Sequence, residues 1–477
     1  MDATIKELKR KNYPIVIAVC FVAFMASLDS YIVTISLPDI SEYFKVSMNM
    51  VSSIIIVFLL FLVGVMLIAG KLADTIGLRN FLVYGYLIFV VGSLFCGLSE
   101  SLMMLNIARA VQGIGAAIMT VVPFNIISKH LPKSITGWAF GLLSTSSALG
   151  LTIGSPLGGF ITEHFSWHWI FLVNVPVGLI AAVYSYKVLP KEKPQAQKRV
   201  SEKFDYAGSI VSFMAIAILT YVLSQGKDMG WTSWKTISLF ASFSTLFILL
   251  IFIEKRTKYP VFKLSLFKNR VFTLANMATI FVFIFLSGNF FLMPFYLKGI
   301  TGLNTQDAGL VLMIYSIVYM FAGPLAGKTS DKIKPALLST IAALSSALGC
   351  LLFAFFLDVH SLIPVILLQV WLGISLGMFI SPNNNLVMSS TKTDERGAAS
   401  GLFTTLSRLS MIVGVIVFEL IFTSSTANGD NIMMSNISQQ VVAHGFKIAY
   451  FAASGILVLG FLFSLAIVIR KPKKLIS

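Results

Sequence analysis

The sequence predicts an all-α polytopic membrane protein of fourteen transmembrane helices. Of its 477 residues, 57% are hydrophobic and 12% are charged, whereas soluble domains carry about 25% charged residues. The apolar residues form long runs, and roughly 20 apolar residues are needed for a helix to cross a hydrocarbon core about 30 Å thick. The Lys and Arg residues gather in the short segments between those runs. We therefore expect the lipid bilayer to be the solvent of this chain.

The predicted spans follow one another with short connections. The first comes after a basic segment, 1–12, and no small-residue cleavage pattern follows it, so we expect a retained helix rather than a removed signal peptide. The fourteen spans are expected at residues 13–37, 51–70, 80–98, 102–126, 136–161, 168–189, 206–223, 233–253, 271–297, 307–327, 335–356, 361–388, 396–423 and 447–469.

The basic residues set the expected orientation. The formal net charge is +16, but the excess is not clustered on one face or tail as nucleic-acid binding would require. With the N-terminus inside, only five of the 36 Lys and Arg residues fall in outer loops, and two lie within helices. Positive residues concentrate on the cytoplasmic side of membrane proteins. We expect cytoplasmic termini, a multi-pass protein of the inner (cytoplasmic) membrane and no nucleic-acid partner.

Two basic loops suggest a division into six, two and six helices. The first loop follows the sixth span, and the second precedes the last six spans. We expect an N-terminal six-helix bundle at 1–190, a basic linker with an inserted helix pair at 191–260, and a C-terminal six-helix bundle at 261–477.

An internal repeat supports this division. Gly70 and Asp74 belong to a Gly-Lys-x-x-Asp pattern after the second span, and Gly327 and Asp331 belong to the same pattern after the tenth. If the inserted pair is omitted, these two spans hold the same place in their halves. Duplicated six-helix halves are a repeat plan of secondary transporters, which bind substrate near the membrane midplane between the repeats.

Four charged residues lie well inside the predicted spans, away from their ends: Asp29, Arg109, Arg408 and Glu419. A charge at a helix centre costs about 2.5–3.5 kcal/mol on insertion scales, so it should face a partner or a cavity. Asp29 and Glu419 are candidate proton carriers that could also contact substrate. For both, a structural hydrogen bond to a neighbouring helix is the alternative.

The two arginines have different surroundings. Arg109 and Gln112 are three residues apart and share a helix face, and Gly113 beside them allows close helix approach. Because an Arg stays charged, it can influence nearby carboxylates. Arg408 lies on the same face as Glu419 but three turns away, and either substrate contact or structural anchoring would explain it.

The fifth span contains Gly154, Pro156, Gly158 and Gly159. Small residues four apart form packing faces in membranes, and a proline kinks a helix. We expect this segment to pack closely and to take part in conformational gating.

Other chemistries lack their motifs. The sequence has no HExxH, GxSxG or P-loop pattern, so we expect neither an enzyme with catalytic residues nor ATP drive. His164 and His168 have ligand-like spacing but straddle a loop, and we expect no metal there. Cys20, Cys96 and Cys350 lie in apolar runs and are expected to be core residues.

Taken in order, these motifs resemble the major facilitator superfamily, specifically its fourteen-helix drug:proton antiporter branch. The segment from Gly70 through Asp74 and Gly77 to Arg79 is similar to the superfamily's loop signature, which implies that Asp74 and Arg79 help to lock one conformation. Asp331 in the second copy is expected to take part in the same gating. The run that begins at Leu28 and Asp29 resembles the first-helix motif, and Arg109-x-x-Gln112-Gly113 resembles the helix-four motif linked to proton coupling. The fifth span is similar to the exporter motif, but Ser155 stands where proline is usual.

The resemblance implies the major facilitator fold and proton-driven export. The expected substrates are small amphipathic or lipophilic compounds, as in multidrug efflux. Cations are expected among them because the candidate site contains acidic groups. Arg109 and Arg408 favour the alternative, an exporter or flippase of an endogenous lipid or an anionic metabolite. A membrane sensor that does not transport is a further alternative. We expect a monomer without cofactors, driven by the proton gradient through alternating access.

Overall fold

The structure, a computed structural model, describes residues 2–191, 205–257, 263–330, 332–357, 361–392, 395–426 and 439–469. Its secondary structure there is entirely helical, and thirteen of the helices are long and apolar enough to cross a membrane. Helix α5 (Lys133–His164), with 32 residues, is also long enough at about 48 Å, but its Gly, Ser and Thr residues make it less apolar. The all-α polytopic fold is confirmed, while the count of fourteen spans and the sides of the termini stay predictions.

The chain forms two compact units. The first comprises Met1–Lys45, Ser53–Val261 and Asn304–Leu310, and the second comprises Val46–Ser52, Phe262–Leu303 and Val311–Ser477. The inserted helix pair and the first turns of α11 therefore belong by their contacts to the first unit. The division into three segments at 190 and 260 stays a prediction.

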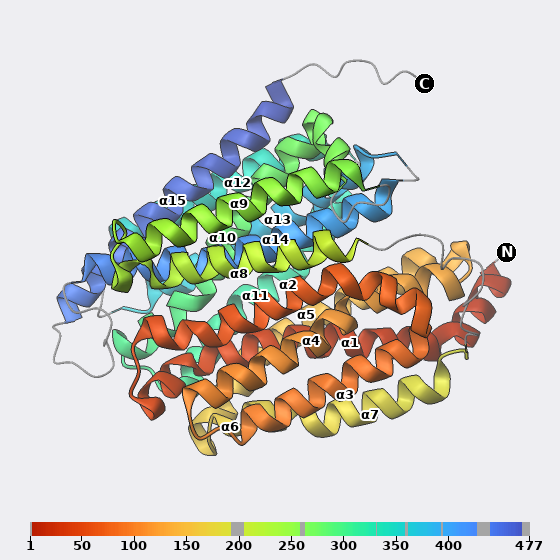
Figure 1. Ribbon diagram of the computed structural model, residues 1–477, viewed down its shortest axis with the longest axis horizontal. Coiled ribbons are helices and arrows are strands. Elements are labelled where there is room, and N and C mark those ends of the chain that lie inside the picture. Colours follow the sequence, from red (N-terminus) through yellow and green to blue (C-terminus); the bar gives the residue numbers. More distant parts are fainter. Residues whose placement is uncertain are drawn as a thin grey trace. The chain divides into compact units, whose positions relative to one another are not determined.

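The helices of the first unit pack in a small number of pairs (Figure 1). The most extensive contacts join α1 to α5, α3 to α4, α8 to α9, and α3 to α7. The helices are α1 (Asp2–Phe44), α2 (Met48–Ile76), α3 (Leu78–Gly97), α4 (Leu102–His130), α5, α6 (His168–Leu172), α7 (Asn174–Val188), α8 (Tyr206–Met229) and α9 (Trp234–Arg256).

Glycines allow two of these pairs to approach closely. Gly150, Gly154 and Gly158 lie one turn apart on α5 and face α1; a Cβ added at Gly150 would lie 2.4 Å from the Phe24 carbonyl oxygen. On α3, a Cβ at Gly92 would lie 2.5 Å from the backbone nitrogen of Gln112 on α4. Backbones this close permit dense van der Waals packing, the main source of helix association in lipid.

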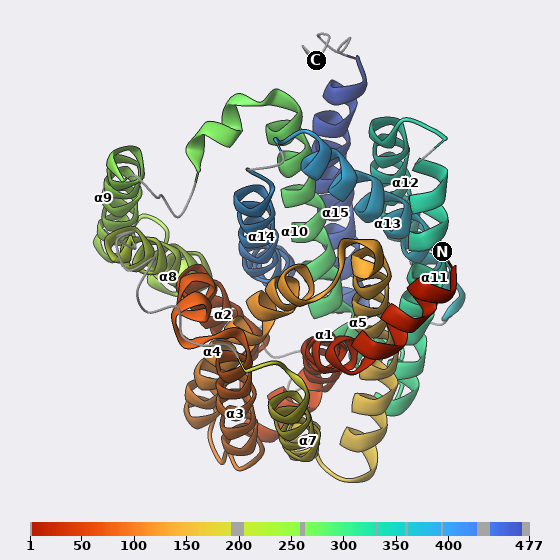
Figure 2. The same ribbon diagram turned by 90° about the vertical axis from the view of Figure 1, so that its right-hand side faces the viewer.

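The inserted pair α8 and α9 forms a hairpin beside α2 (Figure 2). The ring of Phe213 on α8 lies over Gly64 of α2, where an added Cβ would be 2.0 Å away, and it meets the ring of Phe61 edge-on at 5.5 Å. Only 11% of the most apolar stretch of α9 is buried by the rest of the protein. Most of this helix surface is therefore available for contact with lipid.

The second unit repeats the pairing of the first. Contacts join α10 to α14, α12 to α13, α12 to α15 and α10 to α15, the counterparts of α1 with α5, α3 with α4, α3 with α7 and α1 with α7. This agreement supports the predicted duplication. The elements are η1 (Leu264–Lys268), α10 (Arg270–Gly299), α11 (Thr305–Ser330), α12 (Pro335–Phe356), α13 (Ile363–Ser389), α14 (Arg396–Ser425) and α15 (Gln439–Ile469).

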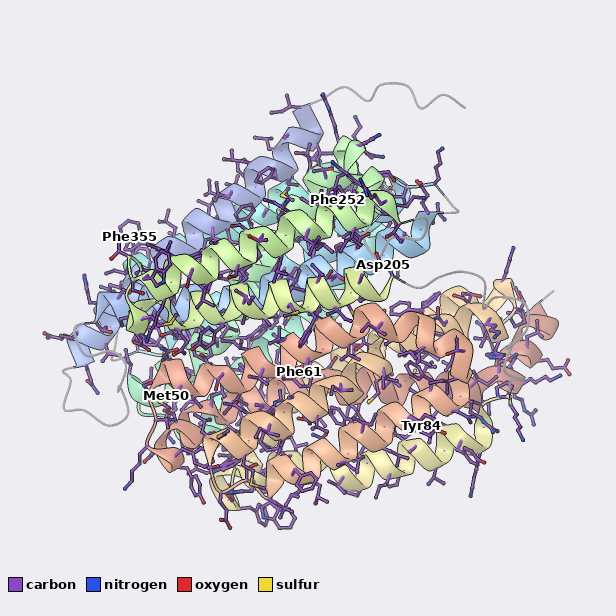
Figure 3. All side chains as sticks on the ribbon, in the orientation of Figure 1. Met50, Phe61, Tyr84, Asp205, Phe252 and Phe355 are labelled. Atoms are coloured by element: carbon purple, nitrogen blue, oxygen red, sulfur yellow. The ribbon has the colours of Figure 1, made fainter. Side chains whose placement is uncertain are left out.

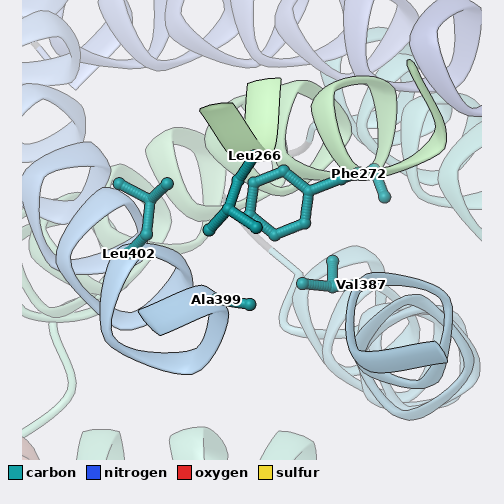
Figure 4. Packing of buried hydrophobic residues seen from close by; sticks show 6 residues of the cluster. Leu266, Phe272, Val387, Ala399 and Leu402 are labelled. Carbon is teal, nitrogen blue, oxygen red and sulfur yellow. The ribbon is translucent and has the colours of Figure 1, made fainter. Parts of the chain in front are cut away.

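One apolar cluster in the second unit joins three helices and the 3-10 turn that precedes them (Figure 4). It contains Leu266 of η1, Phe272 of α10, Val387 of α13 and Leu402 of α14, all at most 5% exposed. The short η1 segment is thereby fixed to the beginnings of α10 and α14.

Many large apolar side chains point outward, as a lipid-facing surface requires. Tyr84 on α3, Phe252 on α9 and Phe355 on α12 project from their helices (Figure 3) and are 51%, 50% and 63% exposed. In water such a surface would aggregate, whereas in a bilayer the acyl chains cover it.

Candidate functional site

Asp29 lies in the middle of α1 and is fully buried. Its Oδ2 accepts a hydrogen bond from Arg109 Nη1 at 3.0 Å, and Oδ1 accepts from Gln112 Nε2 at 2.8 Å and from Asn174 Nδ2 at 2.9 Å. All three partners donate. An ionised carboxylate only accepts hydrogen bonds, so these contacts suit the charged form of Asp29.

Arg109 on α4 is 2% exposed and forms a buried ion pair with Asp29. It has further contacts that do not involve this carboxylate. Its Nε donates to the Ile54 carbonyl on α2 at 3.3 Å, Nη1 donates to Gln112 Oε1, and its Cζ lies 4.0 Å from the ring centroid of Phe58. A cation over an aromatic face is stabilised by the ring quadrupole. The guanidinium is thus held from several sides.

Gln112 links Asp29 to α3. Its Nε2 donates to Ser93 Oγ at 2.8 Å as well as to Asp29, and its Oε1 accepts from Arg109 and from the Cys96 thiol at 3.7 Å. The close approach of α3 at Gly92 places Ser93 within reach. Both ends of the Gln112 amide are therefore engaged.

Asn174 completes the group from α7. Pro176 has no N–H to donate to the Leu172 carbonyl, and the helix is interrupted at Val173, between α6 and α7. Asn174 is the first residue of α7 and is fully buried, yet its Oδ1 has no hydrogen-bond partner within the described part of the chain.

Three residues of the predicted site thus come together with three that were missed. Asp29, Arg109 and Gln112 were expected from the sequence individually, but spacing alone did not show that they meet. Asn174, Ser93 and Phe58 were missed. The signal for Asn174 was an amide within an apolar run, and a polar group inside a membrane usually has a partner.

Arg109 has contacts that do not depend on the charge of Asp29. If Asp29 gains a proton, the ion pair is lost, but Arg109 keeps the Ile54 carbonyl, the Gln112 oxygen and the Phe58 ring. Breaking a buried ion pair by removing one charge normally costs about 3–5 kcal/mol. These other contacts reduce that cost.

The second pair of predicted residues lies on α14. Glu419 is 1% exposed and accepts a hydrogen bond from Thr423 Oγ1 at 3.2 Å. Arg408 is half-buried, and its Nη1 lies 3.7 Å from Met411 Sδ. Eleven residues separate the two charges along the sequence, about 16 Å on a helix, so they do not pair directly.

Gly77 forms the connection between α2 and α3 in the loop signature. This residue has φ of 90°, a conformation in which glycine has no steric penalty. The Cζ of Arg79 lies 4.6 Å from the ring centroid of Tyr186 on α7. A Cβ added at Gly70 would make an ordinary van der Waals contact with Val121, at 3.8 Å. The side chain of Asp74 and the whole of Asp331 lie outside the described residues.

The predicted gating segment of α5 has two packed faces. Gly154 and Gly158 contact α1, whereas a Cβ at Gly159 would lie 2.4 Å from the Thr305 carbonyl oxygen of α11. Pro156 lies within the helix without ending it. Its Cα and the Ser155 carbonyl face Gly309 of α11.

Two carboxylates hold the beginning of α11 next to this segment. The Thr305 backbone N–H donates to Glu163 Oε2 at 2.9 Å, and its hydroxyl donates to Asp39 Oδ2 at 2.9 Å. Carboxylates near a helix N-terminus are favoured because they meet free N–H groups and the positive end of the helix dipole.

The two histidines serve separate contacts. His164 Nδ1 is 3.1 Å from the Phe160 carbonyl oxygen, and its ring stacks on Phe160. His168 Nδ1 is 2.7 Å from Ser166 Oγ, and its ring stacks on Trp167. Among the described residues, no group of three or more His, Cys, Asp or Glu side chains is arranged to hold a metal ion.

The helix pairs of the first unit recur in the second, which is a repeat plan of polytopic secondary transporters. The family model described as "Major Facilitator Superfamily" matches residues 19–415. The chain therefore belongs to the major facilitator superfamily, and it is a multi-pass membrane transporter rather than an enzyme.

Curated relatives from bacteria are similar along most of the chain. The riboflavin transporter RibZ of Clostridioides difficile is 28% identical over 98% of this chain and 100% of its own length. The multidrug resistance protein Stp of Mycobacterium tuberculosis is 27% identical over 83% of this chain and 73% of its own. Stp and other relatives named for multidrug transport or resistance, such as MdtP of Bacillus subtilis, support the multidrug efflux branch that the motifs indicated.

Solved structures agree in fold. A D-xylose–proton symporter aligns with a TM-score of 0.68 over 95% of this chain and 97% of its own, at 16% identity. An inward-facing bacterial homologue of the lysosomal transporter Spinster aligns with a TM-score of 0.65 over 98% of this chain and 99% of its own, at 15% identity. At these identities the likeness extends to the fold alone.

Proposed function

We propose that the chain exports small amphipathic organic compounds in exchange for protons, with Asp29 as a proton carrier. The observation that carries this proposal is the buried Asp29–Arg109 pair. A carboxylate that accepts from three donors is stabilised in its charged form, and the change of state open to it is the gain of a proton. That change removes a charge from the core of the first unit.

The energetics suit such a cycle. One proton that moves down about 100 mV releases about 2.3 kcal/mol, and each pH unit adds about 1.4 kcal/mol. Together they sustain a gradient of several hundredfold for a neutral compound, since every 1.4 kcal/mol corresponds to about tenfold. A single titrating carboxylate is therefore sufficient for useful export.

A second candidate substrate is riboflavin or a similarly planar heteroaromatic compound. It is favoured by the likeness to RibZ, which extends over the whole length of that transporter, whereas this chain matches only 73% of Stp. Lipids and anionic metabolites stay as further candidates because Arg408 is a half-buried cation on α14.

Transport into inverted vesicles tests the function. A panel of lipophilic cations, riboflavin, organic anions and lipids is offered with and without an imposed proton gradient. We expect gradient-dependent uptake of at least one class, and the class that accumulates identifies the substrate. Absence of uptake for every class in the panel would refute amphipathic export.

The Asp29→Asn variant tests the proton carrier. Asparagine keeps the shape but cannot bind a proton, so gradient-driven uptake should fall at least about tenfold, in line with a general acid–base contribution, while substrate exchange without a gradient persists. Glu419→Gln is the matched variant in the second unit. If Asp29→Asn accumulates substrate as the wild type does, Asp29 is not the coupling residue.

A further inference from the structure

Asn174 differs from the other partners of Asp29 in having an unused acceptor. Its Nδ2 donates to Asp29 Oδ1 at 2.9 Å. Its Oδ1 is buried and has no hydrogen-bond partner among the residues that the structure describes. A buried acceptor without a hydrogen bond costs free energy. This oxygen is therefore available to accept a hydrogen bond in another state of the site.

The other amide at the site is fixed in its orientation. Gln112 Nε2 donates to Asp29 and Ser93, and Gln112 Oε1 accepts from Arg109 and Cys96. If this amide turned over, its NH2 group would face the Arg109 guanidinium, and two donors would meet. Gln112 therefore cannot change its role while Arg109 stays in place.

Protonated Asp29 needs an acceptor that its other partners do not offer. A neutral carboxyl group has one O–H to donate. Arg109 has no acceptor, and the Gln112 oxygen is already occupied by Arg109. Among the described side chains that hydrogen-bond to Asp29, Asn174 is the one with a free oxygen.

We propose that the Asn174 carboxamide changes its orientation when Asp29 gains or loses a proton. When Asp29 is charged, the NH2 group donates to Oδ1, as in this structure. When Asp29 Oδ1 takes up a proton, the amide rotates by about half a turn and its Oδ1 accepts the new O–H bond. The proton comes from the gradient, and no other bond is made or broken. This proposal rests on the proposed role of Asp29.

The consequence is a hydrogen-bonded link between the proton and α7. Asp29 is on α1 and Asn174 is the first residue of α7, next to the interruption at Val173. Arg109 and Gln112 both belong to α4. Protonation therefore weakens the link between α1 and α4, where the ion pair is lost and the Gln112 hydrogen bond remains, while α1 keeps its hydrogen bond to α7 with the donor and acceptor exchanged.

Infrared difference spectroscopy on the purified full chain tests the proposal. Lowering the pH should produce the C=O band of a hydrogen-bonded carboxylic acid, and this band should be absent from Asp29→Asn. In Asn174→Leu the acid has no acceptor, so the band should move to higher frequency, and gradient-driven transport should fall by about tenfold. In Asn174→Ser, whose hydroxyl both donates and accepts, both properties should return toward the wild type.

Asn276 on α10 provides the matched control. It is also fully buried, and its Oδ1 likewise lacks a partner within the described residues. Asn276→Leu should leave the Asp29 band and its pH dependence unchanged. If Asn276→Leu and Asn174→Leu have the same effect, Asn174 is only a structural amide and the proposal is wrong.

The two proposals fail in different ways. If no carboxylic acid band disappears in Asp29→Asn, the role of Asp29 itself is overturned. If that band is present but Asn174→Leu does not shift it, only the turning amide is overturned. Should Asn174→Leu not fold, wild-type protein with ¹⁵N-labelled asparagine side chains decides: an asparagine amide band must change on protonation in the wild type and not in Asp29→Asn, and an unchanged band refutes the turn.

Discussion

At the scale of single residues, the candidate site is a charge pair in which one partner has alternatives. Arg109 keeps three contacts besides the carboxylate, whereas Asp29 depends wholly on donors from its neighbours. Sequence reasoning identified both charges because an ionisable residue in an apolar run is expensive. It could not pair them, since they are 80 residues apart and no local periodicity relates α1 to α4.

This pairing predicts non-additive effects on stability. Arg109→Gln leaves Asp29 as an uncompensated buried charge, which should cost about 3–5 kcal/mol of unfolding free energy. The double variant Asp29→Asn, Arg109→Gln should be more stable than Arg109→Gln alone, because neither charge remains. Thermal unfolding of the purified variants in detergent measures the difference. Equal losses that simply add would mean that the two side chains are not coupled.

At the scale of helices, close packing is concentrated at glycines. The sequence indicated the face formed by Gly154 and Gly158, because small residues recur every four positions there. It did not indicate which helix they meet, and the structure shows α1 as the partner. It also did not indicate that Gly159 points the other way, toward the first turn of α11, because a helical repeat defines a face and not its neighbour.

The packing of α5 on α1 predicts contrasting effects of one methyl group. Gly150→Ala would place a Cβ 2.4 Å from the Phe24 carbonyl oxygen, so the helices must separate, at a cost of about 1–3 kcal/mol. Gly141→Ala on the same helix meets nothing within 4 Å and should be neutral or slightly stabilising. Thermal stability in detergent compares them. Equal stability of the two variants would show that α1 and α5 do not pack as described.

At the scale of the whole molecule, composition and charge placement were the most informative. They predicted a polytopic helical protein, and the duplicated pattern of helix pairs agrees with the repeat seen at Gly70 and Gly327. Gln369 on α13 follows Gln112 by the same sequence separation as Gly327 follows Gly70. Membership of the inserted pair in the first unit could not be predicted, because contacts such as that of Phe213 with Gly64 join residues far apart in the sequence.

The distribution of Lys and Arg predicts which ends of the helices face outward. Thr232, between α8 and α9, is exposed and is expected outside, whereas Ser134, at the beginning of α5, is exposed and expected inside. In a chain whose three cysteines are replaced by serine, a maleimide that cannot cross membranes should label Thr232→Cys in intact cells. It should label Ser134→Cys only after permeabilisation. The reverse pattern would invert the topology.

The matching helix pairs do not contain matching chemistry. Ile366 stands on α13 at the position that Arg109 holds on α4, and the buried acid of the second unit, Glu419, lies on α14, the counterpart of α5 and not of α1. The two acids therefore occupy non-equivalent places in the repeat. A substitution at either acid has no acidic counterpart at the matching position of the other unit, so the two can be varied independently.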